Sequence, residues 1–572
     1  MPLHIPVGIE DFRKIREAGL AYVDKSRFIT ELLDAPGTEV VLLPRPRRFG
    51  KSLNLSMLRC FFEKRDEDLS HLFVDLSIWQ AGAAYRAHFQ RYPVILLTLK
   101  ATGAGSFEGC WQAIRERLID LYNEHRYLLD GGRMDEVDVR RYRQILDGTA
   151  SETLYCRALL DLSAHLHAHH GEKVVLLIDE YDEPIHAGYL RGYSAEIIQI
   201  MRAIFADGLK GNAHLHRAVI TGILRVSKES LFSGANNIGV FSLLARRFNT
   251  CFGFTEAEVV ALLERAGKAG DLAAVRFWYN GYLFGGEIIY NPWSVCNFLD
   301  REEPTPRAYW LATSSNDLVR ELLERYALRL EPVFQTLLEG GSIERVLDEN
   351  VVLSELATRE DAMWSLLVFT GYLKPERIGV DALEQDVYRL SIPNREVRQV
   401  YATTFRRWMD VRLQGHGADL ARLTRALLEG DAETLEEQLQ AFVLNLLSYQ
   451  DPGTVDPERV YQGFVLGLLA VLEPEYLVRS NRESGEGRPD VTIRARKPGA
   501  PAAVLELKVA RKGRKTPAAA LREGLAQIRA RRYDAELLAA GASQVHAFAV
   551  AFDGKRVWVK AREATKKKSK RR

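Results

Sequence analysis

The sequence predicts an α/β protein, and two observations support this fold class. Up to about residue 240, short apolar runs alternate with helical patterns, and the runs cover residues 40–43, 94–99, 174–178 and 217–221. This alternation is typical of a mainly parallel sheet with helices on its faces. Toward the other end of the chain, a helical pattern precedes two strand-like runs, a helix and a further strand. A second, smaller α/β unit is therefore expected there.

Length and composition limit the class of protein. The chain has 572 residues, too many for one core at about 100–200 residues per domain. The 78 Lys and Arg residues and 76 Asp and Glu residues leave a net charge of +2, so overall charge does not argue for nucleic acid. The five cysteines form no C-x-x-C pair, and this spacing supports neither a disulfide framework nor a zinc site. With no signal sequence and no long apolar run, we expect a cytoplasmic protein without a membrane partner.

A segment with the form of a phosphate-binding loop follows the first apolar run. Residues 45–52 read Arg-Pro-Arg-Arg-Phe-Gly-Lys-Ser and lead into a helical pattern. Backbone N–H groups and the helix N-terminus would surround phosphate oxygens. Lys51 would reach the β- and γ-phosphates and Ser52 would bind Mg²⁺, although Arg45 replaces the first glycine of the usual signature. The residues predicted to contact the nucleotide in this segment are Arg45, Arg47, Arg48, Phe49, Gly50, Lys51 and Ser52.

Two further strand ends carry polar residues that suit the same site. The apolar run at residues 174–178 ends in Asp179, predicted to bind Mg²⁺, and Glu180, predicted to polarise the attacking water. The run at residues 217–221 ends in Thr221, which would sense the γ-phosphate. Arg225 follows and would approach developing negative charge, with a surface or structural ion pair as the alternative.

The N-terminal part resembles the AAA-ATPase-like domain of a large bacterial family. The segments that carry this resemblance are residues 5–12, 22–26, 45–56, 177–182, 221–227, 279–282 and 290–294. In that family a phosphate loop poor in glycine is the usual form. The resemblance implies ATP binding, with residues 279–294 forming part of a lid over the nucleotide.

A second set of charged residues lies near the C-terminus. Asp490 precedes one strand-like run, and Glu506 and Lys508 end the next run. Strand alternation places the side chains of Glu506 and Lys508 on one face, and Asp490 can share that face from the adjacent strand. Two carboxylates and a backbone carbonyl would hold Mg²⁺, and Lys508 would orient or activate water.

This region resembles the PD-(D/E)XK nuclease superfamily. The resemblance implies that Gln527, in the helical pattern that follows, points toward the metal or the scissile phosphate. A strand pair with a charged edge that maintains solubility is the alternative. Basic residues surround the site in sequence and would contact the DNA backbone rather than read bases, or form a solvated basic face. They are Arg479, Arg482, Arg488, Lys512, Arg514, Lys515, Arg529, Arg531 and Arg532.

These observations predict an ATP-binding and ATP-hydrolysing regulator coupled to a Mg²⁺-dependent nuclease that acts on DNA or another nucleic acid. Two alternatives stay open: a nucleotide-sensing module whose nuclease-like domain binds nucleic acid or protein without cleavage, and a nucleotide-driven motor. A homo-oligomer is also left open. The predicted parts are a P-loop ATPase domain (1–240), a helical lid (241–335), a helical middle region (336–450), a nuclease-like domain (451–562) and a basic tail (563–572).

Overall fold

The chain forms two compact units. A computed structural model describes residues 3–224, 237–301, 305–310, 317–326, 330–338, 340–350, 353–357, 359–401, 403, 417–446, 457–469, 476–480, 489–510 and 515–566. The first unit comprises Met1–Leu322 and Gly340–Val400, and the second comprises Leu323–Glu339 and Tyr401–Arg572. The five-part division expected from the sequence is finer than this and stays a prediction. Within the described part of the chain, no helix is long and apolar enough to cross a membrane.

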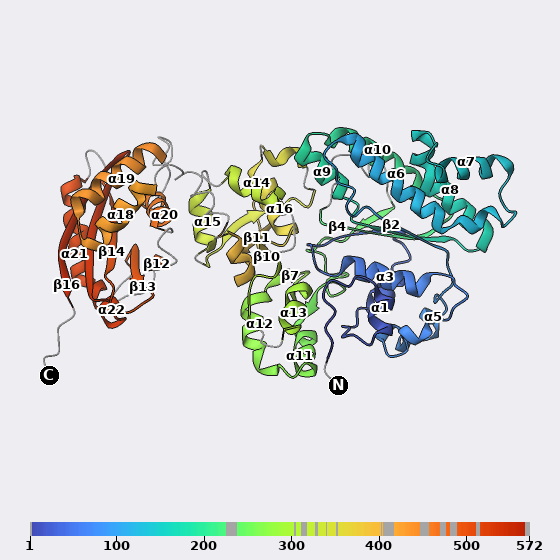
Figure 1. Ribbon diagram of the computed structural model, residues 1–572, viewed down its shortest axis with the longest axis horizontal. Coiled ribbons are helices and arrows are strands. Elements are labelled where there is room, and N and C mark those ends of the chain that lie inside the picture. Colours follow the sequence, from blue (N-terminus) through green and yellow to red (C-terminus); the bar gives the residue numbers. More distant parts are fainter. Residues whose placement is uncertain are drawn as a thin grey trace. The chain divides into compact units, whose positions relative to one another are not determined.

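A five-stranded parallel sheet forms the centre of the first unit, as predicted, with the strand order β2-β3-β4-β1-β5. Its strands are β1 (Val40–Pro44), β2 (Val94–Thr98), β3 (Val174–Asp179), β4 (Leu215–Gly222) and β5 (Ile238–Val240). All residues of β1 and β3 are buried, because helices cover both faces of the sheet. The helices α6, α8 and α10 lie on one face and α1, α3 and α5 on the other (Figure 1). Helices on both faces explain why these strands read as continuous apolar runs.

The helices of this α/β part precede the first strand or connect one strand to the next. They are α1 (Phe12–Glu17), α2 (Arg27–Leu33), α3 (Lys51–Phe62), α4 (Ser77–Gln80), α5 (Ala83–Arg86), α6 (Phe107–Glu124), α7 (Glu136–Leu146), α8 (Glu152–His170), α9 (Glu183–Arg191) and α10 (Ser194–Leu209). Several begin at a Ser or Asp whose side chain accepts a backbone N–H, as Ser106 does for α6.

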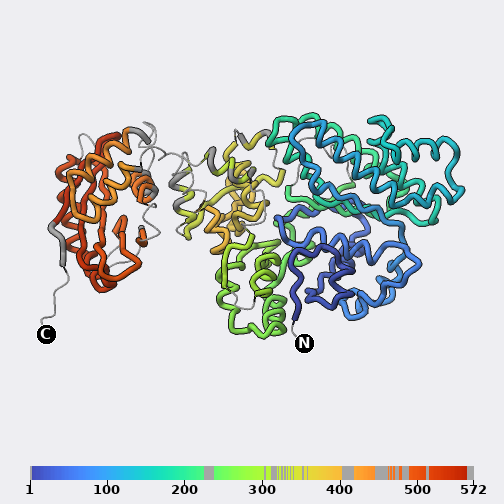
Figure 2. Tube along the Cα trace, in the orientation of Figure 1, coloured from blue at the N-terminus to red at the C-terminus, as the bar shows by residue number. Residues whose placement is uncertain are grey.

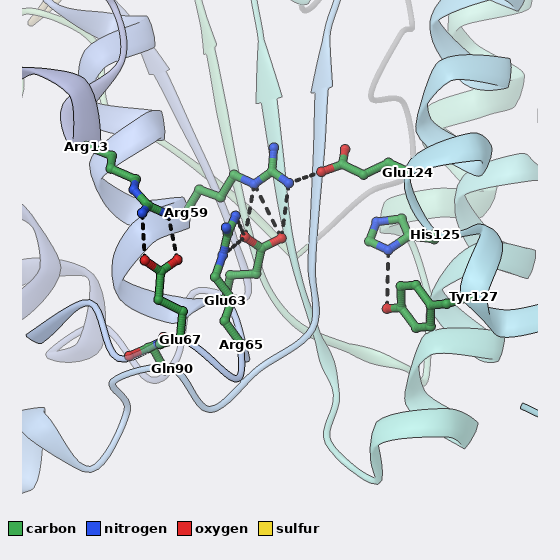
Figure 3. Close-up of polar contacts among 9 residues, drawn as sticks. All are labelled: Arg13, Arg59, Glu63, Arg65, Glu67, Gln90, Glu124, His125 and Tyr127. Carbon is green, nitrogen blue, oxygen red and sulfur yellow. Dashed lines mark hydrogen bonds and ion pairs between the residues drawn. The ribbon is translucent and has the colours of Figure 1, made fainter.

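Ion pairs hold the C-terminal end of α3. Arg59 pairs with Glu63 one turn later and with Glu124 at the end of α6, and Arg65 also pairs with Glu63 (Figure 3). Such partly exposed pairs contribute about 0–1 kcal/mol each, so their role here is mainly to fix the far end of the helix. The N-terminal end of α3, which begins at Lys51, is held separately by the preceding loop.

The lid contains helices, as predicted, together with a three-stranded antiparallel sheet that was not predicted. Its elements are β6 (Phe254–Thr255), α11 (Glu256–Arg265), α12 (Leu272–Tyr279), β7 (Tyr282–Phe284), β8 (Glu287–Tyr290) and α13 (Pro292–Leu299), with sheet order β6-β8-β7. It has its own apolar core, which includes Val259, Tyr279 and Tyr290. The N-terminal segment packs against this core through Leu3 and Ile5, and Figure 2 shows its dark blue trace running beside the green lid.

The middle region likewise combines helices with an unpredicted sheet. Two helices precede this sheet, α14 (Asp317–Tyr326) in the predicted lid range and α15 (Glu331–Leu338) within the second unit. The region then contains β9 (Ile343–Val346), α16 (Glu360–Phe369), β10 (Lys374–Val380) and β11 (Asp386–Ser391). The three strands form an antiparallel sheet in the order β10-β11-β9. Its strands are largely exposed on one face, so their apolar pattern is weak and gave no strand signal in the sequence.

The second unit is built on a mixed five-stranded sheet in the order β12-β13-β14-β15-β16. Only β14 and β15 are parallel, and the other neighbours are antiparallel. The elements are α18 (Gly417–Glu429), α19 (Ala432–Leu446), α20 (Pro457–Leu469), β12 (Tyr476–Ser480), β13 (Val491–Ala495), β14 (Ala502–Val509), α21 (Pro517–Arg531), α22 (Tyr533–Ala539), β15 (Gln544–Asp553) and β16 (Arg556–Lys566).

Residues along β14 alternate between two cores, one on each face of this sheet. Leu505 and Leu507 pack in the core that holds residues of α18, α19 and α20. Ala502 and Val504 pack in the core that holds residues of α21 and α22. The two groups of helices flank the sheet (Figure 1). Because Glu506 alternates with Leu505 and Leu507, its side chain lies on the α21 face.

Candidate functional site

The phosphate loop connects β1 to α3 through a turn that needs left-handed backbone conformations. Arg48 has φ of 69° and Gly50 has φ of 82°, and only the second position is occupied by a residue that favours this region. Lys51 starts α3 with its side chain only 6% exposed. Its Nζ donates hydrogen bonds to Arg45 O at 2.9 Å and Pro46 O at 3.0 Å. Burial lowers the pKa of Lys51, while the carboxylates of Glu180 and Asp179 favour its charge.

Asp179 contacts two other residues of the predicted nucleotide site, Ser52 and Thr221. Its Oδ2 accepts a hydrogen bond from Ser52 Oγ at 2.5 Å, and its Oδ1 accepts one from Thr221 Oγ1 at 2.6 Å. This is possible because β4 lies between β1 and β3, so the ends of all three strands meet at one edge of the sheet. A hydroxyl and a carboxylate in contact are the hard oxygen ligands that Mg²⁺ prefers. Ser52 and Asp179 therefore fit the ion.

A cavity of about 420 Å³ opens beside these residues. Its walls include the polar residues Lys51, Ser52 and Glu180 and the apolar residues Val7 and Trp293. The N-terminal segment supplies Val7, and the lid, which was predicted to cover the nucleotide, supplies Trp293. A cavity that combines charged groups with apolar walls suits a nucleotide, whose phosphates and base need both.

Glu180 also lines the cavity and has φ of 52°. Burial raises the pKa of its carboxyl group, and the nearby Lys51 ammonium opposes this effect. Its role toward the attacking water stays a prediction.

The prediction that Arg45 contacts the nucleotide is wrong, because its side chain does not line the cavity. Its guanidinium is fully buried and donates to Pro44 O at 2.8 Å, Phe241 O at 2.7 Å and Phe248 O at 3.1 Å. Burial lowers the pKa of Arg45 to about 10. It therefore supports the loop from behind and does not contact a nucleotide. Arg45 stands where the usual signature has its first glycine, and its contacts with three carbonyl groups are structural.

The other loop residues line the cavity in different ways. Arg47 Nη2 lies 3.6 Å from Glu183 Oε2, and the Arg48 guanidinium lies over the Trp293 ring at 4.3 Å from its centroid. The Phe49 ring is buried and packs edge-on against Tyr282, with centroids 5.0 Å apart. Phe49 thus fastens the loop to the lid. Arg225 lies outside the described residues, as do Arg482, Arg488, Lys512 and Arg514.

The three predicted residues of the second site meet at β14. Asp490 Oδ2 accepts a hydrogen bond from Leu507 N at 2.7 Å, which fixes this carboxylate beside the strand that carries Glu506. Lys508 Nζ donates to Glu506 Oε1 at 2.9 Å, and both side chains are buried. Gln462 of α20, which the sequence did not identify, donates from Nε2 to Asp490 O at 2.9 Å.

Glu506 pairs with Lys508 through one carboxylate oxygen, while its other oxygen is left without a partner among the described residues. Its side chain is 1% exposed, and its Oε2 has no hydrogen-bond partner among the described residues. Burial, together with the Asp490 carboxylate, raises the pKa of Glu506 to about 7, and the Lys508 ammonium opposes this rise. An unpartnered buried carboxylate oxygen next to a second carboxylate fits a bound cation. No cluster of three or more His, Cys, Asp or Glu ligands occurs in the described ranges, so backbone or water oxygens would complete the coordination.

The helix α21 lies directly over this site. A Cβ atom on Gly524 would lie 2.9 Å from Ala549 Cβ and 3.7 Å from Glu506 Cβ, so glycine allows the close approach. Gln527 follows one helical turn later and is partly buried. Residues three apart share a helix face, which places Gln527 on the side of α21 that Gly524 turns toward the sheet.

Comparison with known proteins gives the family. The AAA-ATPase-like family, described as Predicted AAA-ATPase, matches residues 6–232, and the PD-(D/E)XK nuclease superfamily matches residues 456–562. The chain is 30% identical over 400 residues to a protein of Azotobacter chroococcum mcd 1 named "Uncharacterized protein in vnfD 5'region". The aligned region covers 69% of this chain and 68% of that protein. The chain belongs to the AAA-ATPase-like family and carries a C-terminal domain of the PD-(D/E)XK nuclease superfamily. Its architecture joins a nucleotide-binding domain to a nuclease-like domain.

Proposed function

We propose that this chain is an ATP-binding and ATP-hydrolysing regulator joined to a Mg²⁺-dependent nuclease that cleaves phosphodiester bonds in DNA. The observation that supports this most is the unpartnered, buried Glu506 Oε2 beside Asp490 and Lys508, in a chain that has a separate phosphate loop. Each group of residues suits a different phosphate substrate. The regulatory part of the proposal follows from their presence in one chain.

In the nucleotide site, Lys51 would exchange the two loop carbonyls for phosphate oxygens. Lys51 already lines the cavity, so only the end of its side chain would have to move. Ser52 and Asp179 would hold Mg²⁺, which supplies charge neutralisation on the phosphate oxygens when it is bound. Glu180, in its ionised form, would orient the attacking water and accept its proton.

In the nuclease-like site, Asp490 and Glu506 would hold a divalent cation. The bound ion would polarise the phosphodiester and its attacking water. Lys508 would then donate a hydrogen bond to that water or to the scissile phosphate in place of Glu506 Oε1. Exposed basic residues nearby would bind the nucleic-acid backbone without base specificity, so binding should weaken steeply with salt. Arg479, Arg529, Arg531 and Arg532 are exposed.

Contacts inside the first unit offer a physical route from the phosphate loop toward the rest of the chain. A Cβ atom on Gly371 would lie 3.1 Å from Pro46 Cβ, and one on Gly281 would lie 2.2 Å from Pro393 O, so both pairs of segments touch closely. Beyond them, the buried Glu396 accepts hydrogen bonds from Ser294 Oγ at 2.8 Å and from the Trp310 backbone N–H at 2.7 Å. A change in the loop on ATP binding would therefore shift the segments that it contacts. These segments precede Val400, the last residue of this unit.

The proposal is tested by measuring ATP hydrolysis and plasmid nicking side by side. Lys51→Ala should lose ATP hydrolysis, and Asp490→Ala should lose nicking while it keeps ATP hydrolysis. Exposed residues provide matched controls, Lys210→Ala for the first site and Glu536→Ala for the second, and both should behave as wild type. Nicking that survives Asp490→Ala would remove the nuclease assignment.

One observation favours the second candidate, a nucleotide sensor whose nuclease-like domain binds without cleavage. The site offers only two carboxylates, and no larger group of metal-ligating side chains occurs in the described part of the chain. This candidate predicts ATP binding and DNA retention with no nicking, and no effect of replacing Lys508. The same assay therefore separates the two candidates.

A further inference from the structure

The chain turns sharply after β3, and Glu180 adopts a conformation that L residues rarely occupy. Its φ of 52° falls in the left-handed region, where glutamate has no local preference. Non-glycine residues stay in this region only when surrounding contacts hold them there. The contacts that hold Glu180 must come from the residues on either side of it.

The next two residues bind the end of β4 through four hydrogen bonds. Tyr181 N donates to Thr221 O at 3.1 Å, and Tyr181 Oη donates to Leu224 O at 2.7 Å. Asp182 Oδ2 accepts from Ile223 N at 2.8 Å and from Leu224 N at 2.9 Å. We name these contacts, between residues 181–182 and residues 221–224, the strand-end clamp.

The clamp is buried and leaves no room for a side chain at its centre. Tyr181 is 0% exposed and Asp182 is 1% exposed. A Cβ atom on Gly222 would lie 2.6 Å from Asp182 Oδ1 and 2.6 Å from Tyr181 Cδ1. The clamp therefore depends on glycine at position 222 as well as on the acceptor at position 182.

We propose that Asp182 is a positioning residue for ATP hydrolysis: the strand-end clamp holds Glu180 in the cavity and Thr221 against Asp179. This inference rests on the proposed ATPase activity. On one side of the clamp, the chain at Glu180 is forced to turn its carboxylate toward Lys51. On the other side, the end of β4 is fixed so that Thr221 Oγ1 donates to Asp179 Oδ1 at 2.6 Å. Without the clamp, Glu180 would return to a negative φ and leave the cavity.

The phosphate loop has one backbone hydrogen bond to the clamped segment, from Arg45 N to Gly222 O at 2.9 Å, and this bond does not involve the side chain of Asp182. Lys51 is held by carbonyl groups of residues 45 and 46, and the start of α3 is fixed by the loop itself. Loss of the clamp should therefore slow the chemical step and leave nucleotide affinity nearly unchanged. A general loss of structure would instead reduce both.

The test compares Asp182→Ala, Asp182→Asn and Gly222→Ala with wild type in the full chain. Asp135→Ala is the matched control, because Asp135 also accepts a backbone N–H, from Asp138 at 2.8 Å, at a helix start. Two quantities are measured: kcat and Kd for ATP, and hydrogen exchange at the amides of Ile223 and Leu224. Asp182→Ala should lower kcat by about ten- to a hundredfold, as small displacements of catalytic groups do, with Kd within about threefold.

In the same variant, hydrogen exchange at the amides of Ile223 and Leu224 should be at least about tenfold faster, because their acceptor is gone. Asp182→Asn keeps an oxygen acceptor and should recover most of kcat, and Gly222→Ala should resemble Asp182→Ala. An Asp182→Ala enzyme with normal kcat, or with kcat and affinity lost together, overturns the inference. If wild type does not hydrolyse ATP, the proposed ATPase activity is wrong. In that case, unchanged hydrogen exchange at Ile223 and Leu224 in Asp182→Ala would separately contradict the strand-end clamp.

Discussion

The two candidate sites both place a buried lysine beside carboxylates, yet they balance these charges differently. In the first unit, both oxygens of Asp179 accept hydrogen bonds from hydroxyls, and Lys51 donates to two carbonyls. In the second unit, Glu506 receives one hydrogen bond from Lys508, and its other oxygen has no partner in the described part of the chain. Burial raises the pKa of Glu506 to about 7.

This difference indicates how each site responds to its ligand. Hydroxyls and carbonyls already compensate the groups of the nucleotide site, so its residues are in place before the nucleotide binds. The nuclease-like site holds a carboxylate whose ionised form is penalised by burial, and a cation would remove that penalty. We therefore expect divalent metal to change the stability of the second unit. We expect it to leave the geometry of the nucleotide site nearly unchanged.

The largest expected effect comes from Glu506→Gln. Glutamine has the same shape but cannot supply the charge that a divalent ion needs, so plasmid nicking should fall by about a thousandfold. The apo protein should keep about the stability of wild type, because the change removes a penalised buried carboxylate and also the charge that pairs with Lys508. Nicking rates and thermal melting measure the two effects, with the exposed Glu536→Gln as control. A variant that nicks normally would show that Glu506 does not bind the ion.

Lys51→Ala should weaken ATP binding by about ten- to a hundredfold. The variant loses charge-assisted hydrogen bonds to phosphate, worth about 1.5–3 kcal/mol. Binding of a fluorescent ATP analogue measures the change, and Lys210→Ala serves as control. Metal binding by the second unit should be unaffected, and a parallel loss there would mean that the two sites are not separate.

Metal affinity at the second site should rise about tenfold from about pH 6 to about pH 8, because the ion needs ionised Glu506. The folded-state pKa of about 7 lies above the ordinary value of 4.5. Without metal, the stabilisation from protonated Glu506 is therefore fully present below about pH 4.5 and is lost as pH rises through about 7. Titration with Mg²⁺ across this range, with Glu506→Gln as control, measures the effect. A flat profile that matches the variant would contradict the raised pKa.

The smallest expected effect on ligand binding comes from Arg45→Lys. Lysine cannot reach all three carbonyls that the guanidinium contacts, so the free energy of unfolding should fall by about 1–3 kcal/mol. The affinity of the folded protein for ATP should stay within about threefold, because Arg45 lies behind the loop. Thermal melting and ATP titration measure the two quantities, with the exposed Arg27→Lys as control. A large loss of affinity without loss of stability would restore Arg45 as a nucleotide contact.

Sequence patterns identified most residues of the two candidate sites, but not the contacts that hold each of them in place. Continuous apolar runs predicted β1 and β3, since strands buried on both faces leave that signal. The alternation in Glu506-Leu507-Lys508 placed both charged side chains on one face. No pattern could show that Arg45 is buried, because its acceptors at residues 241 and 248 are distant in sequence.

The missed strands and contacts have physical reasons too. The short strands of the lid and the exposed strands β10 and β11 bury few side chains, so their periodicity is weak. Gln462 acts through its amide on a backbone carbonyl, and Asp182 acts on backbone N–H groups of another strand. Such contacts depend on how distant segments come together, which no local sequence signal records.

The most direct test of the account is the effect of ATP on Mg²⁺-dependent plasmid nicking. The measurement compares nicking rates with and without saturating ATP for wild type, Lys51→Ala and Glu506→Gln. Regulation by the nucleotide site predicts a change of about fivefold or more in wild type, none in Lys51→Ala, and no nicking in Glu506→Gln. Equal nicking rates in wild type with and without ATP would contradict the account.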